Sequence, residues 1–229
     1  MTAERPAPES LSEDSVLALL KQPDLSPEVI ERIRKNSGAM KSRKVRLALA
    51  AHLKTPRHIS LPMVPHFFTF DLMQLALTPV APADVKKVAE DALINRLETI
   101  SSGERLTLAR RASGRIAGEL LLDAETRVMQ AAMENSRLTE PPVIKAILRR
   151  DASAALIQVV CHHAKWSLRR EIRIALLRSQ HTPMAKAVEF AREIPIPLLR
   201  EVLQTSKLPA QVKTYLLHDV PGRKSDAQK

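Results

Sequence analysis

Apolar positions along this 229-residue chain gather in short runs, each followed about ten residues later by a small or polar residue and a proline. The clearest copy runs from Val45 to Thr55-Pro56, and each run is long enough for about three helical turns. A residue before proline is pushed out of the α region, and Ser or Thr before Pro suits the start of a new helix. The pattern therefore predicts pairs of helices that meet at these prolines. Further copies run from Val16 to Pro27, Leu72 to Pro82, Val128 to Pro141, Ile172 to Pro183 and Leu198 to Pro209.

The spacing of these prolines predicts a repeat. Successive steps between positions 27, 56, 82, 141, 183 and 209 are 29, 26, 59, 42 and 26 residues. Periods of roughly 20–50 residues mark arrays of one supersecondary unit. The 59-residue step holds about two units, with Ser113-Gly114 at the missing break, and the 42-residue step leaves room for an extra helix.

The elements expected from this pattern are fourteen or fifteen short helices and no strand. Residues 82–97 show the clearest helical stripe, and Ser101 with Glu104 forms a possible capping box. Gly38 is expected to end a helix in a left-handed cap. Residues 1–12 are expected to be a disordered tail, residues 13–220 the helical array, and residues 221–229 a flexible basic tail.

Composition agrees with helices packed through aliphatic side chains. Apolar residues make up 45% of the chain, aromatic residues only 3%, and there are five glycines. The single Cys161 excludes an intramolecular disulfide framework and a zinc site built from cysteines. The polar N-terminus lacks the apolar core of a secretory signal, and no apolar run reaches the ~20 residues of a membrane span. A cytoplasmic location and no membrane association are therefore expected.

The segment from Asp123 to Ile144 resembles a HEAT-like repeat, particularly the leucine-rich-repeat-variant kind found in bacteria. Lys44-Val-Arg-Leu-Ala-Leu and Glu171-Ile-Arg-Ile-Ala-Leu are similar to the Val-Arg step of such repeats. The resemblance implies an all-α fold, an α-solenoid of about seven antiparallel helix pairs used mostly as an interaction surface. Some proteins of this family carry an N-terminal cysteine cluster for iron and sulfur. This chain has no such cluster, so no cofactor is expected.

Net charge of +11 favours polyanionic partners at low salt. Three basic runs supply the candidate polyanion-binding residues, which would line up on one face of a solenoid. The other interpretation is that these are ordinary solvated helix faces, with Arg46 and Arg173 bonded to a neighbouring repeat. The candidates are Lys41, Arg43, Lys44, Arg46, Arg110, Arg111, Arg115, Lys165, Arg169, Arg170 and Arg173.

Two other clusters are candidates for chemistry or binding. Phe67, Phe68 and Phe70 form an apolar cluster that is either a patch for a protein partner or a plug in the core. Cys161-His162-His163 invites a metal site, but adjacent helical residues point about 100° apart, so no metal ligand is assigned. Scattered carboxylates fit helix caps and dipoles, and no catalytic motif is present, so no catalytic residue is assigned.

The function expected from these patterns is a non-enzymatic scaffold that binds a protein partner on one face of the array. The alternative is sequence-independent binding of duplex DNA or structured RNA through a basic stripe. A HEAT-like DNA glycosylase is a remote alternative, because its pocket needs aromatic residues beside an acid and no such arrangement is seen. The nucleic-acid hypothesis requires that the basic runs share a face and that acids do not.

Overall fold

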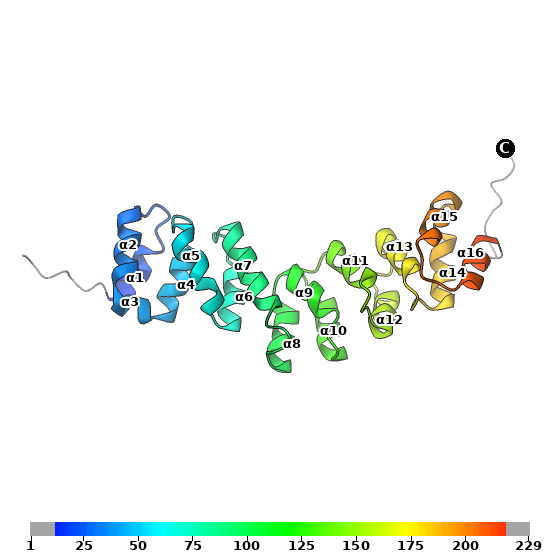
Figure 1. The fold of residues 1–229 in the computed structure, drawn as a ribbon, viewed down its shortest axis with the longest axis horizontal. Helices are drawn as coiled ribbons and strands as arrows, with labels where there is room; N and C mark the ends of the chain where they lie inside the picture. The colour runs from blue at the N-terminus through cyan, green and yellow to red at the C-terminus, as the bar shows by residue number, and fades with distance from the viewer. Residues whose placement is uncertain (1–11, 219–229) are drawn as a thin grey trace, which may run out of the picture. The chain divides into compact units, whose positions relative to one another are not determined.

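A computed structural model describes residues 12–218, and the expected tails therefore lie outside the described residues except for Ser12. The protein is all-α: residues 12–218 form sixteen α-helices, one 3-10 helix and no strand (Figure 1). Ser12 caps the first helix by accepting from the Ser15 N–H. The described chain divides into two compact units, which meet in sequence between Glu104 and Arg105.

The first unit begins with helices whose apolar sides enclose one cluster around Ile30, Ile33, Val45 and Leu49. Within this unit α4 contacts α1, α3, α5 and α6. Its elements are α1 Glu13–Leu19, α2 Pro27–Lys35, α3 Ser37–Lys41, α4 Arg43–Ala51, α5 Arg57–Met63, η1 Val64–His66, α6 Thr69–Leu77 and α7 Ala83–Ile94. The expected stripe is confirmed within α7, which buries Val85, Ala89 and Leu93, but the helix ends at Ile94 and does not reach residue 97.

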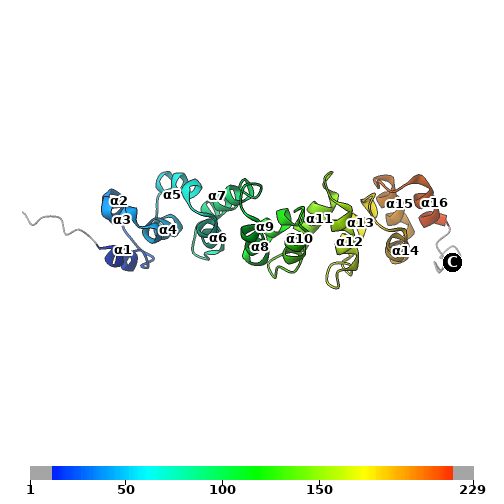
Figure 2. The same cartoon turned by 90° about the horizontal axis from the view of Figure 1, so that it is seen from below.

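The second unit begins at Arg105, inside α8 (Ser102–Arg111). The first residues of this helix belong to the first unit. Its most buried helix is α13, which buries every residue from Ile172 to Leu177 and contacts α11, α14 and α15 (Figures 1 and 2). The helices are α9 Gly114–Leu120, α10 Thr126–Met133, α11 Glu140–Leu148, α12 Ala154–His162, α13 Arg170–Arg178, α14 Met184–Arg192, α15 Ile196–Gln204 and α16 Ala210–His218.

Helices begin at or beside these prolines, as expected. The Ser or Thr before the proline, however, does not have the same role at each of them. Ser26 caps α2 through its side chain, with Pro27 in the first turn. Thr55 and Thr182 are not caps, because the helices after them begin beyond Pro56 and Pro183. Their hydroxyls instead donate to carbonyls six residues earlier, Thr55 to Leu49 at 2.7 Å and Thr182 to Leu176 at 2.5 Å. The threonine thus closes the turn between paired helices.

At the helix ends near residues 36 and 101, one expectation from the sequence is wrong and the other is confirmed. Gly38 does not form a left-handed cap: α2 ends at Lys35, and Gly38 lies inside α3. The Asn36 side chain accepts from the Ala39 N–H at 3.0 Å, so Asn36 starts the next helix immediately. The capping box is confirmed, with Ser101 N–H donating to Glu104 at 3.1 Å and Glu104 N–H donating to Ser101 Oγ at 3.3 Å.

A polar residue within three positions of a helix end recurs in both units, and we call it the exit residue. Its side chain accepts a hydrogen bond from the backbone N–H two residues later, which fixes the turn that leaves the helix. These bonds are 2.8–3.3 Å long. The exit residues are His52, Asp123, Asn135, His163, Ser179 and Ser206.

Several exit residues also reach back to the exit turn of an earlier helix. His52 Nε2 lies 2.8 Å from the Gln22 carbonyl, Asn135 Nδ2 donates to the Ala109 carbonyl at 2.8 Å, and Ser206 Oγ donates to the Leu177 carbonyl at 2.6 Å. The partners are 30, 26 and 29 residues apart. These separations are close to the three shorter proline steps of 26–29 residues, so a similar interval separates the helix ends that touch within each unit.

Candidate functional site

Two successive loops of the second unit are joined at the end of α8 and the end of α10. Asn135 donates to the Ala109 carbonyl at 2.8 Å and to the Ala112 carbonyl at 3.2 Å. Arg137 Nη1 donates to the Arg111 carbonyl at 3.2 Å. A methyl group on Gly114 would lie 2.2 Å from the Arg137 carbonyl oxygen, so the two loops are in direct contact. Residues 110–115 and 134–139 therefore form one continuous surface.

A third loop, residues 163–170, joins the second. His163 Nε2 lies 3.1 Å from Glu134 Oε1, and Trp166 Nε1 donates to the Met133 carbonyl at 3.4 Å. Trp166 is only 2% exposed, so its indole anchors the loop from inside. We call segments 110–115, 134–139 and 163–170 together the basic edge.

The basic edge carries a large excess of positive charge. Its three segments contain seven Lys or Arg and one acid, Glu134. All seven basic residues are exposed, and within residues 12–218 the side chains of Arg110, Arg111, Arg169 and Arg170 form no ion pair. The seven are Arg110, Arg111, Arg115, Arg137, Lys165, Arg169 and Arg170. Like charges gathered with few acids among them create a positive potential that attracts polyanions.

Lys165 and Trp166 show how the edge keeps one of its charges in place. Lys165 Nζ lies 4.1 Å from the centre of the Trp166 ring. A cation over an indole face is attracted by the ring's electrons, which holds the exposed ammonium over a buried side chain. The aromatic ring supports the charge and does not offer a free stacking surface.

Arg173 is a wrong candidate for polyanion binding, because it is only 8% exposed. Its Nε donates to the Ser167 carbonyl at 2.6 Å, its Nη1 pairs with Glu193, and its guanidinium lies 5.4 Å from the Phe190 ring centre. Arg173 is thus bonded to Ser167 and Glu193, on either side of it along the chain, and does not face solvent. Arg173 positions the loop that carries Arg169 and Arg170.

The first basic run lies in the other unit and is less available. Arg43 pairs with buried Asp71 through two bonds of 2.5 and 2.7 Å and lies 4.9 Å from the Phe68 ring centre. Hydrogen bonding to Asp71 raises the pKa of Arg43. Lys41 and Lys44 are exposed, whereas Arg46 is half-buried. The Arg46 Nε is buried and has no hydrogen-bond partner among the described residues.

The apolar cluster divides between core and surface. Phe67 is only 4% exposed, so the prediction that it belongs to a patch for a protein partner is wrong. Phe68 and Phe70 are 64% and 42% exposed. Phe67 precedes α6 in extended conformation, and its carbonyl accepts from Arg96 Nη1 at 2.7 Å. Neighbouring residues of an extended chain point in opposite directions, which turns Phe68 outward.

The Cys-His segment at the end of α12 is structural. Cys161 is buried in α12, and burial raises the pKa of its thiol to about 11. His162 Nδ1 lies 2.9 Å from the Gln158 carbonyl, and His163 is held at Glu134. Within residues 12–218 no three His, Cys, Asp or Glu side chains are placed to hold one metal ion.

The structure adds Arg137 to the residues expected from sequence, and with it the loop that joins the two basic runs. The available signal was the Asn135-Ser-Arg137 turn after an apolar helix, since an exit residue places the side chain two positions later at the same turn. None of the helices in the described region is both long and apolar enough to cross a bilayer. Comparison with protein-family models, with curated proteins and with solved structures finds no match to this chain.

Proposed function

We propose that this protein is a non-enzymatic binding module that holds the phosphate backbone of a nucleic acid along the basic edge. The observation that carries the proposal is the joining of the 110–115 and 163–170 runs through the 134–139 loop, with seven basic residues against one acid. Lys and Arg contacts to phosphates release counterions and do not depend on base sequence. The module would therefore bind without strong sequence preference.

The distribution of charge favours the second unit as the binding unit. Residues 105–218 contain 19 Lys and Arg against 10 Asp and Glu, whereas residues 12–104 contain 13 against 11. The buried indole of Trp166 leaves no stacking platform among the three segments, and single-strand binding usually depends on such platforms. Duplex DNA or structured RNA, whose phosphates are presented on a rigid backbone, fits the edge better.

The proposed architecture is an α-solenoid of HEAT-like helix pairs. Its support is the agreement between the proline steps of 26 and 29 residues and the loop contacts at 26–30 residues. A repeat array places equivalent turns beside each other, which is how three separate basic segments come to share one edge.

The test is fluorescence anisotropy of a labelled duplex and a labelled hairpin RNA, titrated with the full chain at several salt concentrations. We expect log affinity to fall linearly with log salt, by about 0.9 for each phosphate contact on duplex DNA. The variant Arg111→Gln/Arg169→Gln/Arg170→Gln should bind more weakly and show a smaller slope. The control Arg32→Gln/Arg127→Gln/Arg200→Gln removes the same charge from exposed residues outside the basic edge.

Equal losses in the two variants would show that net charge alone attracts the duplex, and the proposal would be wrong. Absence of binding near physiological salt would also contradict it. Tight binding of poly-glutamate with no binding of either nucleic acid would instead identify an acidic protein as the partner.

A second candidate function is a scaffold for a protein partner, and exposed Phe68 and Phe70 favour it. They are 64% and 42% exposed, beside the Arg43–Asp71 ion pair of the first unit. The double variant Phe68→Ser/Phe70→Ser would abolish capture of such a partner while leaving the melting temperature unchanged. A partner captured equally by this variant and the original chain would exclude these side chains from the contact.

A further inference from the structure

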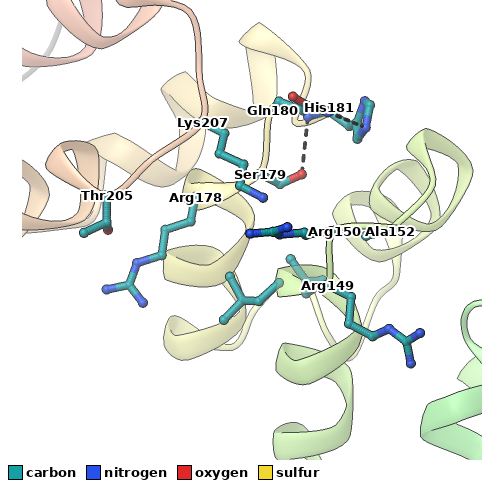
Figure 3. Close-up of a pocket in the computed structure, with 11 residues that line it drawn as sticks. Arg149, Arg150, Ala152, Arg178, Ser179, Gln180, His181, Thr205 and Lys207 are labelled. Carbon is teal, nitrogen blue, oxygen red and sulfur yellow. Dashed lines mark hydrogen bonds between the residues drawn. The ribbon is translucent and has the colours of Figure 1, made fainter.

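A cavity of about 100 Å³ opens where the ends of α11, α13 and α15 meet in the second unit (Figure 3). Four of its lining side chains are basic or can become so: Arg150, Arg178, His181 and Lys207. A fifth, Arg149, is neutralised by Asp151 at 2.8 Å and Glu119 at 3.0 Å. No Asp or Glu lines the cavity itself, so Arg150, His181 and Lys207 share it without an acidic neighbour in the lining.

Ser179 places an unused hydrogen-bond donor at this cavity. It is 8% exposed, and its Oγ accepts from the His181 N–H at 3.3 Å. Among the described residues no acceptor receives the Ser179 hydroxyl proton. A buried hydroxyl without an acceptor costs free energy, so an acceptor from outside the chain would stabilise it.

The repeat shows where that acceptor belongs. Ser206, the exit residue of α15, accepts from Leu208 N–H at 3.1 Å and also donates to the Leu177 carbonyl at 2.6 Å. Ser179 makes the first of these bonds and lacks the second. The earlier exit turn that it would reach, 26–30 residues before it, is the turn around Arg149 and Arg150. The cavity lies between Ser179 and that turn.

Two of the basic side chains, those of Lys207 and Arg150, are drawn near Ser179. Figure 3 shows the Lys207 amine directed toward Ser179, with the Arg150 guanidinium drawn below both. The guanidinium groups of Arg149 and Arg178 extend away in opposite directions. The Arg178 Nε is itself buried and has no hydrogen-bond partner among residues 12–218. Ser179, Arg150 and Lys207 thus bring donors to a cavity that no Asp or Glu lines.

We propose that this cavity binds a single phosphate group, either inorganic phosphate or a phosphate monoester. A phosphate offers several strong acceptor oxygens in a tetrahedral arrangement, which matches donors that approach from different loops. Charge-assisted bonds from Arg150 and Lys207 offset its two negative charges, and the Ser179 hydroxyl donates to a third oxygen. The lining residues are separate from the basic edge, so this inference does not rest on the proposed function.

The experiment is isothermal titration calorimetry of the full chain with inorganic phosphate, phosphoserine and adenosine monophosphate, at constant ionic strength. We expect at least one of these probes to bind at one site per chain. Arg150→Gln/Lys207→Gln should weaken binding by tenfold or more, since a bond to a charged group contributes about 1.5–3 kcal/mol. Preference among the three probes distinguishes free phosphate from a phosphorylated side chain or a nucleotide.

The matched control is Arg127→Gln/Arg200→Gln, which removes the same charge from exposed positions that do not line the cavity. It should retain phosphate binding, as should Arg111→Gln/Arg169→Gln/Arg170→Gln on the basic edge. Ser179→Ala should also lose affinity while circular dichroism remains unchanged. No binding of any probe, retention of affinity in Arg150→Gln/Lys207→Gln, or equal loss in the control would overturn the proposal.

Discussion

At the residue scale, close contact between loops decides which positions tolerate change. Gly114 begins α9 directly against the Arg137 carbonyl, and Gly118 lies where a methyl group would come within 2.6 Å of Pro142. Gly103, in the first turn of α8, has no atom within 4 Å of an added methyl group. The same chemical change therefore has opposite expected effects at these positions.

Gly114→Ala is expected to destabilise the protein, because its methyl group would force the joined loops apart. Overpacking of this kind costs about 1–3 kcal/mol. Gly103→Ala adds a helix-favouring residue in open space and should be neutral or stabilising by about 0.5–1 kcal/mol. Urea unfolding monitored by circular dichroism measures both. Equal effects of the two substitutions would contradict the loop contact.

Cys161 is expected to be unreactive in the folded protein. Burial raises the pKa of its thiol to about 11, so the reactive thiolate is a very small fraction at pH 7–8. Folding stability from this group is full below the ordinary thiol pKa and is lost as pH rises toward 11, because the unfolded thiol ionises first. A thiol-specific reagent at pH 8 should label the chain only after denaturant is added. Rapid labelling without denaturant would show that the thiol is accessible.

At the element scale, the turn between paired helices is closed from two sides. The exit residue caps the turn, and in two pairs the threonine before proline donates back to the first helix. In the α13–α14 pair Thr182 is 6% exposed, and its acceptor Leu176 also accepts from the Ser179 N–H at 2.9 Å. The hydroxyl bond therefore adds a second donor to an already paired carbonyl.

Thr182→Val keeps the volume of the side chain and removes this bond. We expect the free energy of unfolding to fall by about 1 kcal/mol, the net value of a typical hydrogen bond. Thr214→Val is the control, since the Thr214 hydroxyl makes an exposed bond to the Ala210 carbonyl within α16. That control should change stability by less than about 0.5 kcal/mol. Chemical denaturation compares the two, and a neutral Thr182→Val would show that the bond is not stabilising.

At the scale of the whole molecule, charge is divided unequally between the two units. The second unit holds most of the positive excess, and seven of its basic residues lie on the three segments of the basic edge, which are joined by hydrogen bonds. In the first unit, ion pairs join Arg43 to Asp71, Arg57 to Asp84 and Lys54 to Asp24. The two units should therefore respond differently to a polyanion.

Binding of a duplex is expected to protect the basic edge and to leave residues 41–57 unprotected. Lysine and arginine modification of the full chain, with and without duplex, followed by mass spectrometry measures this. Arg111, Arg137 and Lys165 should become less reactive, whereas Lys44 should not change. Protection centred on Lys41 and Lys44 would place the contact in the first unit instead.

Much of the local structure could be predicted from the sequence, because it depends on neighbours along the chain. Apolar spacing predicted the helices and the buried face of α7, the shorter proline steps were close to the interval between touching helix ends, and Ser101 with Glu104 predicted a cap. These features need only helical geometry and the restriction that proline imposes. A bonded Arg173 was one of two open interpretations, and it came from the resemblance of Glu171-Ile-Arg-Ile to the Val-Arg step of HEAT-like repeats.

The site depended on the tertiary structure, because residues 26–30 apart in sequence must meet before it exists. Pattern alone could not tell that Phe67 turns inward and Phe68 outward, or that Thr182 bonds backward and does not cap α14. It could not show that Asn135 and Arg137 join the two basic runs. Composition and apolar spacing thus determined an all-α, basic chain, whereas loop packing determined which charges gather and which donors, such as the Ser179 hydroxyl, have no acceptor among the described residues.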